Sequence, residues 1–228
     1  MRNKTFEIRV CESCGLRYPL VEGHSHGTRC PICMGNTRVA LRVSRETITE
    51  PSPTRPSDTL PKSFGFREGQ RWGLAVLLDN IRSAWNVGSI LRSAEGFGFA
   101  HAYLCGITPT PENDAVQKTS LGAEETVTWS YHKDAVKLAN GLKAEGWKVL
   151  ALEEDKRAIP ITRAPTAGFA IAQPSAQRET IIVGNEVTGV DPELLDLCDE
   201  IFYIPMRGEK KSFNVAIAFS VAAYELQK

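Results

Sequence analysis

From residue 72 to the end of the chain, short apolar runs alternate with stretches in which apolar residues recur every three or four positions. The run 73–78 is typical of a strand buried on both faces, and residues 86–97 place Val87, Ile90 and Leu91 on one face of a helix. The same patterns predict further strands over 102–104, 126–130, 148–152, 180–183 and 200–204, and helices over 115–121, 133–145, 192–198 and 213–226. Strands that alternate with helices predict an α/β fold with a parallel sheet covered on both faces.

The pattern before residue 72 is different. Residues 1–45 contain short strand-like runs around four cysteines, and residues 46–71 lack periodicity and contain four prolines, which favour an extended spacer. The sequence therefore predicts a small module over 1–45, a linker over 46–71 and an α/β domain over 72–228. Within that domain, residues 160–178 contain three prolines and no clear element, so we expect a long loop that is either functional or mobile.

The composition is that of a folded protein, with 42% hydrophobic and 24% charged residues. The chain has no run of eighteen apolar residues, and its first ten residues lack the apolar core of a signal peptide. We therefore expect a cytoplasmic protein with no membrane partner. The net charge is zero, but residues 1–71 contain 12 basic against 7 acidic residues, and the remainder 15 against 20. An excess of basic residues in the N-terminal part of a chain is typical of a segment that contacts nucleic acid. A charge difference of this size between two parts of a chain also arises by chance.

Four of the six cysteines form two C-x-x-C pairs, Cys11 with Cys14 and Cys30 with Cys33, with fifteen residues between the pairs. Two thiolates on one tight turn can bind the same ion at about 2.3 Å, and two such turns complete a tetrahedron. The spacing therefore predicts a structural Zn²⁺ site. A pair of disulfides is not expected without a secretion signal, and a redox motif would need only one pair.

The segment around the cysteines resembles a zinc ribbon, which has too few apolar residues to fold without its metal. Basic residues surround the predicted site: Arg2, Lys4, Arg9, Arg17, Arg29, Arg38 and Arg42. They suit a phosphate backbone, so we expect the module to contact RNA; zinc ribbons also bind proteins, and that alternative stays open. His24 and His26 are expected in an exposed loop, and Cys105 and Cys198 in the core.

Three segments of the larger domain place polar residues where a predicted strand ends. In the first, 80–98, the chain turns through Asn86 and Gly88 into a helix, and Arg92 follows six residues after Asn86. The start of a helix favours anions, so an arginine there is better explained as a ligand for phosphate or an alkoxide than by the helix dipole. An ordinary surface arginine would have the same spacing.

The second segment, 181–189, follows a strand with Gly184 and Glu186, and the third, 204–218, follows another strand with Ser212 and Asn214. Ligands of open parallel sheets bind beyond the carboxyl ends of the strands, where glycine lets the backbone approach them closely. Ser212 is also expected to cap the last helix, with Asn214 in its first turn. Each segment alone has a structural explanation, but together the three predict one binding site.

In order and content, the three segments resemble the SpoU (TrmH-like) family of SPOUT RNA methyltransferases over residues 72–228. The resemblance implies a parallel-sheet α/β domain whose C-terminal part forms a deep trefoil knot, a topology that general folding rules would not predict. It also implies a homodimer that binds S-adenosylmethionine and methylates a ribose 2′-hydroxyl of RNA, either tRNA or rRNA.

The positions of the motifs show which residues of this chain match the site residues of the family. The catalytic positions are matched by Asn86, Arg92, Glu186, Ser212 and Asn214. The cofactor pocket is matched by Gly184, Asn185, Glu186, Gly189, Ile204, Met206, Ser212, Asn214, Val215 and Ala216. Two departures stand out, because Phe213 replaces the commoner leucine and the segment 160–178 is longer than the family's usual connection.

The family mechanism gives Arg92 a part in deprotonating the 2′-hydroxyl. Since arginine stays protonated, we expect Arg92 instead to bind phosphate and to stabilise the developing alkoxide. Three alternatives stay open: a base methyltransferase of the same superfamily, a non-catalytic RNA-binding protein on this fold, and an enzyme that binds a small nucleotide. The intact catalytic positions argue against the second, and the missing G-x-G-x-x-G turn after the first strand argues against the third.

Overall fold

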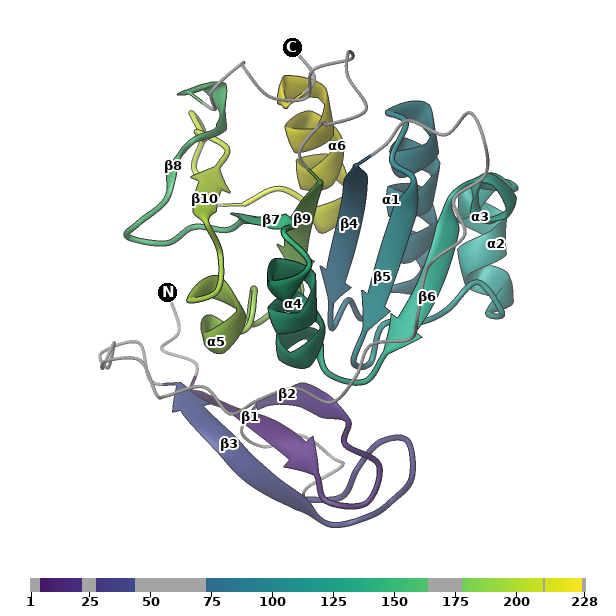
Figure 1. The fold of residues 1–228 in the computed structure, drawn as a ribbon, viewed down its shortest axis with the longest axis vertical. Helices are drawn as coiled ribbons and strands as arrows, with labels where there is room; N and C mark the ends of the chain where they lie inside the picture. Colours follow the sequence, from purple (N-terminus) through teal and green to yellow (C-terminus); the bar gives the residue numbers. More distant parts are fainter. Residues whose placement is uncertain (1–4, 22–27, 44–72, 164–177, 211, 227–228) are drawn as a thin grey trace.

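The computed structural model describes residues 5–21, 28–43, 73–163, 178–210 and 212–226. These residues form a small antiparallel sheet near the N-terminus and a larger parallel sheet with helices on both faces (Figure 1). The predicted α/β class with a parallel sheet is confirmed. The linker 46–71, His24 and His26 lie outside the described residues. None of the helices in the described ranges has the length and hydropathy to traverse a lipid bilayer.

The N-terminal sheet has the strand order β2-β1-β3 and consists of β1 (Phe6–Cys11), β2 (Arg17–Val21) and β3 (Thr37–Val43). Both strand pairs are antiparallel. The short strands predicted around the cysteines are therefore present. The buried cluster of this sheet is small, and it comprises Cys11, Leu16, Tyr18 and Cys30. So small a core is typical of a module that a metal stabilises.

The larger sheet has seven parallel strands in the order β6-β5-β4-β9-β7-β10-β8 (Figure 1). Their bounds are β4 (Leu74–Asp79), β5 (His101–Cys105), β6 (Thr128–His132), β7 (Lys148–Leu152), β8 (Ile159–Pro160), β9 (Glu179–Gly184) and β10 (Glu200–Tyr203). Strand β9 lies between β4 and β7, so a late part of the chain is inserted among earlier strands. The trefoil knot implied by the family resemblance stays a prediction.

Helices cover both faces of the larger sheet. On one face are α1 (Ala84–Gly96), α2 (Asp114–Ser120), α3 (Ala123–Thr126) and α6 (Val215–Glu225), and on the other are α4 (Ala135–Ala144) and α5 (Pro192–Leu195). Alternate residues of β4 belong to two cores, because Val76 and Leu78 pack with the first group of helices and Ala75 and Leu77 with the second. Burial on both faces explains why this strand is apolar throughout.

Four of the five predicted helix starts differ from the observed ones, because side-chain caps decide them, and the start of α5 at Pro192 agrees. Helix α1 begins at Ala84, two residues before the predicted start, and Ser83 caps it by accepting a hydrogen bond from the N–H of Asn86. The expected cap of the last helix by Ser212 is wrong. Asn214 caps α6, since its side-chain oxygen accepts a hydrogen bond from the N–H of Ala216 at 3.0 Å.

The segment 160–178, predicted to lack an element, begins with two short ones. Pro160 belongs to β8, which pairs with β10, and Ile161–Arg163 form a 3₁₀ turn. Residues 164–177 lie outside the described ranges. Helix α3 was not predicted, because four residues are too few to show helical periodicity.

The N-terminal sheet packs against the carboxyl ends of β5 and β6 (Figure 1). The main-chain N–H of Arg17 donates a hydrogen bond to the carbonyl oxygen of Lys133 at 2.9 Å, and Ile107 packs against the small cysteine-rich cluster. The small sheet therefore contacts the edge of the large sheet at which parallel sheets bind their ligands.

Candidate active site at the carboxyl edge of the sheet

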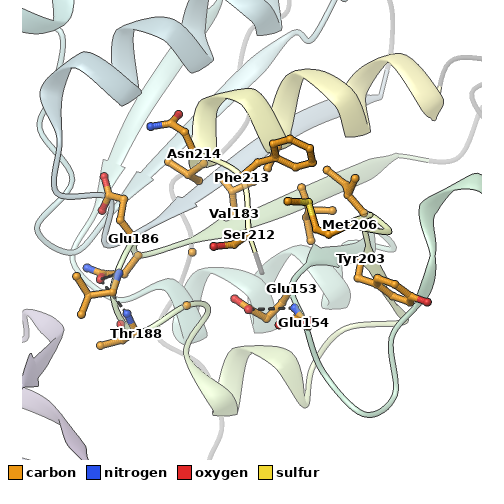
Figure 2. A pocket seen from close by; sticks show the side chains of 18 residues that line it. Glu153, Glu154, Val183, Glu186, Thr188, Tyr203, Met206, Ser212, Phe213 and Asn214 are labelled. Atoms are coloured by element: carbon orange, nitrogen blue, oxygen red, sulfur yellow. Dashed lines mark hydrogen bonds between the residues drawn. The ribbon is translucent and has the colours of Figure 1, made fainter. Parts of the chain in front are cut away.

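A cavity of about 490 Å³ opens at the carboxyl ends of β7, β9 and β10 (Figure 2). Its walls are the end of β7 with the two residues after it (152–154), the end of β9 with the loop after it (183–189), the end of β10 with the chain after it (203, 204 and 206), and the start of α6 with the residues before it (212–215 and 218). Two of the three polar segments singled out in the sequence, 181–189 and 204–218, therefore build the cavity together.

The loop after β9 is folded tightly on itself. The N–H of Gly189 donates a hydrogen bond to the carbonyl oxygen of Asn185 at 2.8 Å, and the N–H of Asn185 donates to the carbonyl oxygen of Gly189 at 3.1 Å. The side-chain oxygen of Asn185 accepts hydrogen bonds from the N–H groups of Val187 and Thr188. A side chain on Gly184 would collide with the main chain of Gly189. Glycine at position 184 therefore allows the two backbones to approach and form this wall.

Glu186 ties this loop to the start of α1. Its carboxylate accepts hydrogen bonds from the N–H of Arg82 at 2.9 Å, the N–H of Ser83 at 3.1 Å and the side-chain amide of Asn86 at 2.8 Å. Burial raises the pKa of Glu186, but these hydrogen bonds outweigh it and lower the pKa below the ordinary value. The group is therefore a carboxylate at neutral pH.

Asn86 connects the first and third polar segments. Its side-chain oxygen accepts a hydrogen bond from the side-chain amide of Asn214 at 3.0 Å. Glu186, Asn86 and Asn214 thus form a chain of hydrogen bonds at the ends of three elements that are far apart in the sequence, and Figure 2 shows Glu186 and Asn214 at the same end of the cavity. The sequence predicted that these three residues belong to one site, and the structure brings them together.

The other two predicted catalytic residues lie differently. Ser212 is exposed and lines the cavity. Arg92 is exposed on α1 and is not among the residues that line the cavity in the described part of the chain. Within one copy of the chain, therefore, the structure does not bring Arg92 to the site.

Nine of the ten residues predicted for the cofactor pocket line the cavity. The exception is Ala216, which is buried within the core around α6 and does not reach the cavity. Sequence reasoning missed the wall after β7, which includes Glu153 and Glu154. The only available signal was their place directly after a predicted strand, at the same edge of the sheet as the other segments.

Glu153 is a half-buried carboxyl group in that wall. One of its oxygens accepts a hydrogen bond from the N–H of Val190 at 2.9 Å, and the other from the N–H of Glu154 at 3.0 Å. Burial raises the pKa of Glu153, and these two hydrogen bonds oppose the rise. Glu153 therefore fixes the far end of the loop that follows β9.

The four predicted metal ligands lie together in the N-terminal sheet. The sulfur atoms of Cys11, Cys14, Cys30 and Cys33 all lie within 4.8 Å of one another. The distance from Cys11 Sγ to Cys33 Sγ is 3.5 Å and that from Cys14 Sγ to Cys30 Sγ is 3.7 Å, too long for disulfides. A tetrahedron with Zn–S bonds of about 2.3 Å has S–S edges of about 3.8 Å, so the four sulfur atoms fit a zinc ion.

Two of the arginines expected to contact a phosphate backbone are not available for it. Arg9 is buried in an ion pair with Glu7 and donates to Thr37. Arg17 is buried in an ion pair with Asp191 of the larger domain. Spacing in the sequence cannot reveal either pairing, because the partners are set by strand register and by packing between the two sheets.

The fold and the cavity define an α/β protein with a cavity at the carboxyl edge of a parallel sheet, lined by backbone, apolar side chains and carboxylates. The family model described as the SpoU rRNA Methylase family matches residues 73–224, and the chain belongs to this family.

Relatives of the chain include named enzymes. It is 32% identical over 160 residues to the tRNA (guanosine(18)-2'-O)-methyltransferase of Thermus thermophilus, which covers 68% of this chain and 74% of that protein. It is 28% identical over 158 residues to the 23S rRNA (guanosine-2'-O-)-methyltransferase RlmB of Acinetobacter baylyi, covering 67% of this chain but only 58% of that protein.

Solved structures share the fold. The SpoU methyltransferase AviRb from Streptomyces viridochromogenes, in complex with AdoMet, matches with a TM-score of 0.61 and 22% identity over 75% of this chain and 64% of that one. The A. aeolicus TrmH/SpoU tRNA modifying enzyme matches with a TM-score of 0.59 and 23% identity over 71% and 76% of the two chains.

Proposed function

We propose that the protein is an S-adenosylmethionine-dependent methyltransferase that acts on a ribose 2′-hydroxyl of tRNA or rRNA. The observation that carries the proposal is the hydrogen-bonded group of Asn86, Glu186 and Asn214 beside the cavity, in a chain of the SpoU family. The names of the relatives, guanosine 2'-O-methyltransferases of tRNA and of 23S rRNA, support both the reaction and the substrate class.

The lining of the cavity suits S-adenosylmethionine. When bound, this cofactor supplies a methyl group activated by a positively charged sulfonium. The apolar side chains of Val183, Ile204 and Met206 would hold its adenine, and Glu153 and Glu154 would favour its positive charges. The backbone of the tight loop 184–189 would contact its polar groups, as would Ser212, Asn214 and Val215 at the start of α6.

The reaction itself needs the ribose oxygen to be held in line and to lose its proton, so positioning contributes much of the rate. Asn86, Asn214 and Ser212 would orient the RNA through hydrogen bonds. Glu186 would act by fixing the loop before α1, since its carboxylate already binds two main-chain N–H groups there. Arg92 would bind phosphate and stabilise the developing alkoxide.

Within one copy of the chain, Arg92 does not line the cavity. In a homodimer, Arg92 of one copy would reach the cavity of the other copy. Arg92 lies seven residues after Trp85, and both are exposed on α1, so they share one face of that helix. The neighbouring helix α6 exposes Ile217 and Tyr224. Exposed apolar side chains on two adjacent helices are typical of a protein interface. We infer that α1 and α6 face a second copy, with Arg92 of each copy serving the other's cavity.

The four cysteines would bind a structural Zn²⁺ that stabilises a module over 1–45, joined by the linker 46–71 to the methyltransferase domain over 72–228. Burial raises the pKa of Cys14 to about 12, so metal binding would displace a proton from this thiol. The exposed Arg29 and Arg38 of this module would contact RNA. A cytoplasmic location accords with RNA substrates and with reduced cysteines.

The target is identified by mapping 2′-O-methylation across tRNA and rRNA in cells with and without this protein. We expect one or a few ribose methylations to disappear with the protein and to return when the gene is restored. An unchanged map would contradict the proposed function.

A further inference from the structure

We propose that Arg17, in the N-terminal sheet, is a positioning residue for the cavity of the larger domain and acts through Asp191 at the end of the loop that lines it. The proposal rests on the proposed function for the identity of the ligand alone. The contacts that support it lie wholly within this chain.

The ion pair between these two residues is buried and has two contacts. Arg17 Nε lies 2.7 Å from one carboxylate oxygen of Asp191, and one of its terminal nitrogens lies 3.2 Å from the other. The exposed fractions of the two side chains are 7% and 3%. A planar guanidinium that binds both oxygens of a carboxylate fixes orientation as well as distance.

The main chain holds Arg17 in place from its own side. Its N–H donates to the carbonyl oxygen of Lys133 at 2.9 Å, and its carbonyl oxygen lies close to Gly106, whose φ of 64° is a left-handed conformation. A side chain at position 106 would contact this carbonyl oxygen, so glycine permits the approach. Arg17 is therefore a fixed point against which Asp191 can be held.

Asp191 transmits this position to the cavity through its neighbours in the chain. Its own N–H donates to the buried carboxyl group of Asp79 at 2.9 Å. The N–H of Val190, one residue earlier, donates to Glu153, which lines the cavity. Gly189, one residue earlier again, closes the tight loop with Asn185, and both residues line the cavity. Three consecutive residues thus connect the ion pair to the cavity wall.

Removal of the guanidinium would leave two buried acidic groups, Asp79 and Asp191, without their cation. Burial and the neighbouring Asp191 raise the pKa of Asp79 to about 7, and Arg17 opposes this rise. An unpaired buried carboxylate is strongly destabilising, so Asp191 would move toward water. This movement would loosen residues 189–191 and with them the cavity wall.

The test compares Arg17→Met with Arg9→Met in the full-length, metal-loaded protein. Arg9 is a matched control, because it is also a buried, ion-paired arginine of the N-terminal sheet but contacts Glu7 and Thr37 of that sheet. The probe is S-adenosylhomocysteine, with its affinity measured by calorimetry. Hydrogen exchange of residues 187–191 is measured without any ligand, and zinc content is measured in parallel.

We expect Arg17→Met to weaken S-adenosylhomocysteine binding about tenfold, to speed exchange over 187–191 and to leave zinc content unchanged. In the methylation assay the KM for the cofactor should rise, whereas kcat at saturating cofactor should stay near that of the wild type. Arg9→Met should leave ligand affinity and exchange in this loop unchanged. Wild-type affinity and exchange in Arg17→Met would overturn the proposal.

If Arg17→Met does not fold, Arg17→Lys decides the question, because lysine keeps the charge but loses the two-pronged geometry. A loss of S-adenosylhomocysteine affinity that is smaller than tenfold, together with faster exchange over 187–191, supports the proposal. Wild-type values for both overturn it. Failure of the wild-type protein to bind S-adenosylhomocysteine would instead contradict the proposed function, and the exchange data would still test the role of Arg17.

Discussion

The carboxylate of Glu186 lies 2.8 Å from the side-chain amide of Asn86, although 100 residues separate them in the chain. The contact joins the loop after β9 to the start of α1, and Asn214 extends it to the start of α6. The ends of three separate segments are therefore fixed relative to one another before any ligand binds. Such preorganisation is what a reaction that depends on positioning requires.

Replacement of Glu186 by alanine should release the loop before α1. The N–H groups of Arg82 and Ser83 would lose their acceptor, and Asn86 would lose its orientation. We expect methyl transfer to fall about 10- to 100-fold, measured by single-turnover kinetics. Glu95→Gln, an exposed change on the same helix, is the control and should leave the rate unaltered.

Arg92→Ala should abolish methyl transfer and leave cofactor affinity almost unchanged, because Arg92 does not line the cavity of its own chain. Gly184→Val should abolish cofactor binding, because a side chain there collides with the main chain of Gly189 and Val190.

Mixing the two inactive variants, Arg92→Ala and Gly184→Val, tests whether Arg92 acts across a homodimer. A mixed dimer has one site with an intact cavity and an intact arginine, so activity should reappear. No recovery in a mixture shown to contain mixed dimers would place Arg92 within its own copy.

Replacement of Cys11 and Cys14 by serine should remove zinc from the protein. The cluster that these cysteines share with Leu16 and Tyr18 is small, so we expect a lower melting temperature and weaker RNA binding. Metal content by mass spectrometry and RNA affinity by filter binding check the two expectations. Cys198→Ala is the control, since Cys198 lies outside the cysteine cluster. Unchanged RNA affinity in the metal-free protein would assign the module to protein contact instead.

The buried carboxyl group of Asp79 should make folding stability depend on pH. Burial and Asp191 raise its pKa from 3.8 to about 7, so between these values the folded state binds more protons than the unfolded state. The contribution of Asp79 to the free energy of unfolding therefore falls as the pH rises through this window. His101 acts in the opposite direction, because burial lowers its pKa from 6.5 to about 4.

The pH dependence of Asp79 is isolated by comparison with Asp79→Asn, since His101 contributes equally to both proteins. Denaturant unfolding of the two proteins at several pH values gives the difference in stability. We expect the free energy of unfolding of the wild type, relative to that of Asp79→Asn, to fall as the pH rises from 4 to 7. A difference that is constant over this range would show that Asp79 keeps an ordinary pKa.

Much of the fold could be predicted from the sequence because its signals are local. The apolar run of β4 reflects burial on both faces, and the bounds of β7 agree with the prediction. Apart from α5, which begins at Pro192 as predicted, the helix starts could not be predicted to the residue. Side-chain caps decide them, and both Ser212 and Asn214 are capable of capping, although only Asn214 lies at the right position.

The site residues, too, were predicted where the signal lies within a motif and were missed where a contact depends on residues far apart in the sequence. Motif positions predicted that Asn86, Glu186 and Asn214 belong together. For Glu153 the only signal was its place directly after a predicted strand. The pairing of Arg17 with Asp191 could not be predicted, because it depends on how the two sheets pack. Because this pairing could not be predicted from the sequence, Arg17 was expected to contact RNA.

The most direct test of the proposed activity is nucleoside analysis after incubation of the purified protein with unmodified tRNA and rRNA and methyl-labelled S-adenosylmethionine. We predict that the label appears in a 2′-O-methylated nucleoside with the wild-type protein and not with Arg92→Ala. Label in a methylated base, or no transfer by a protein that binds the cofactor and RNA, would contradict the account.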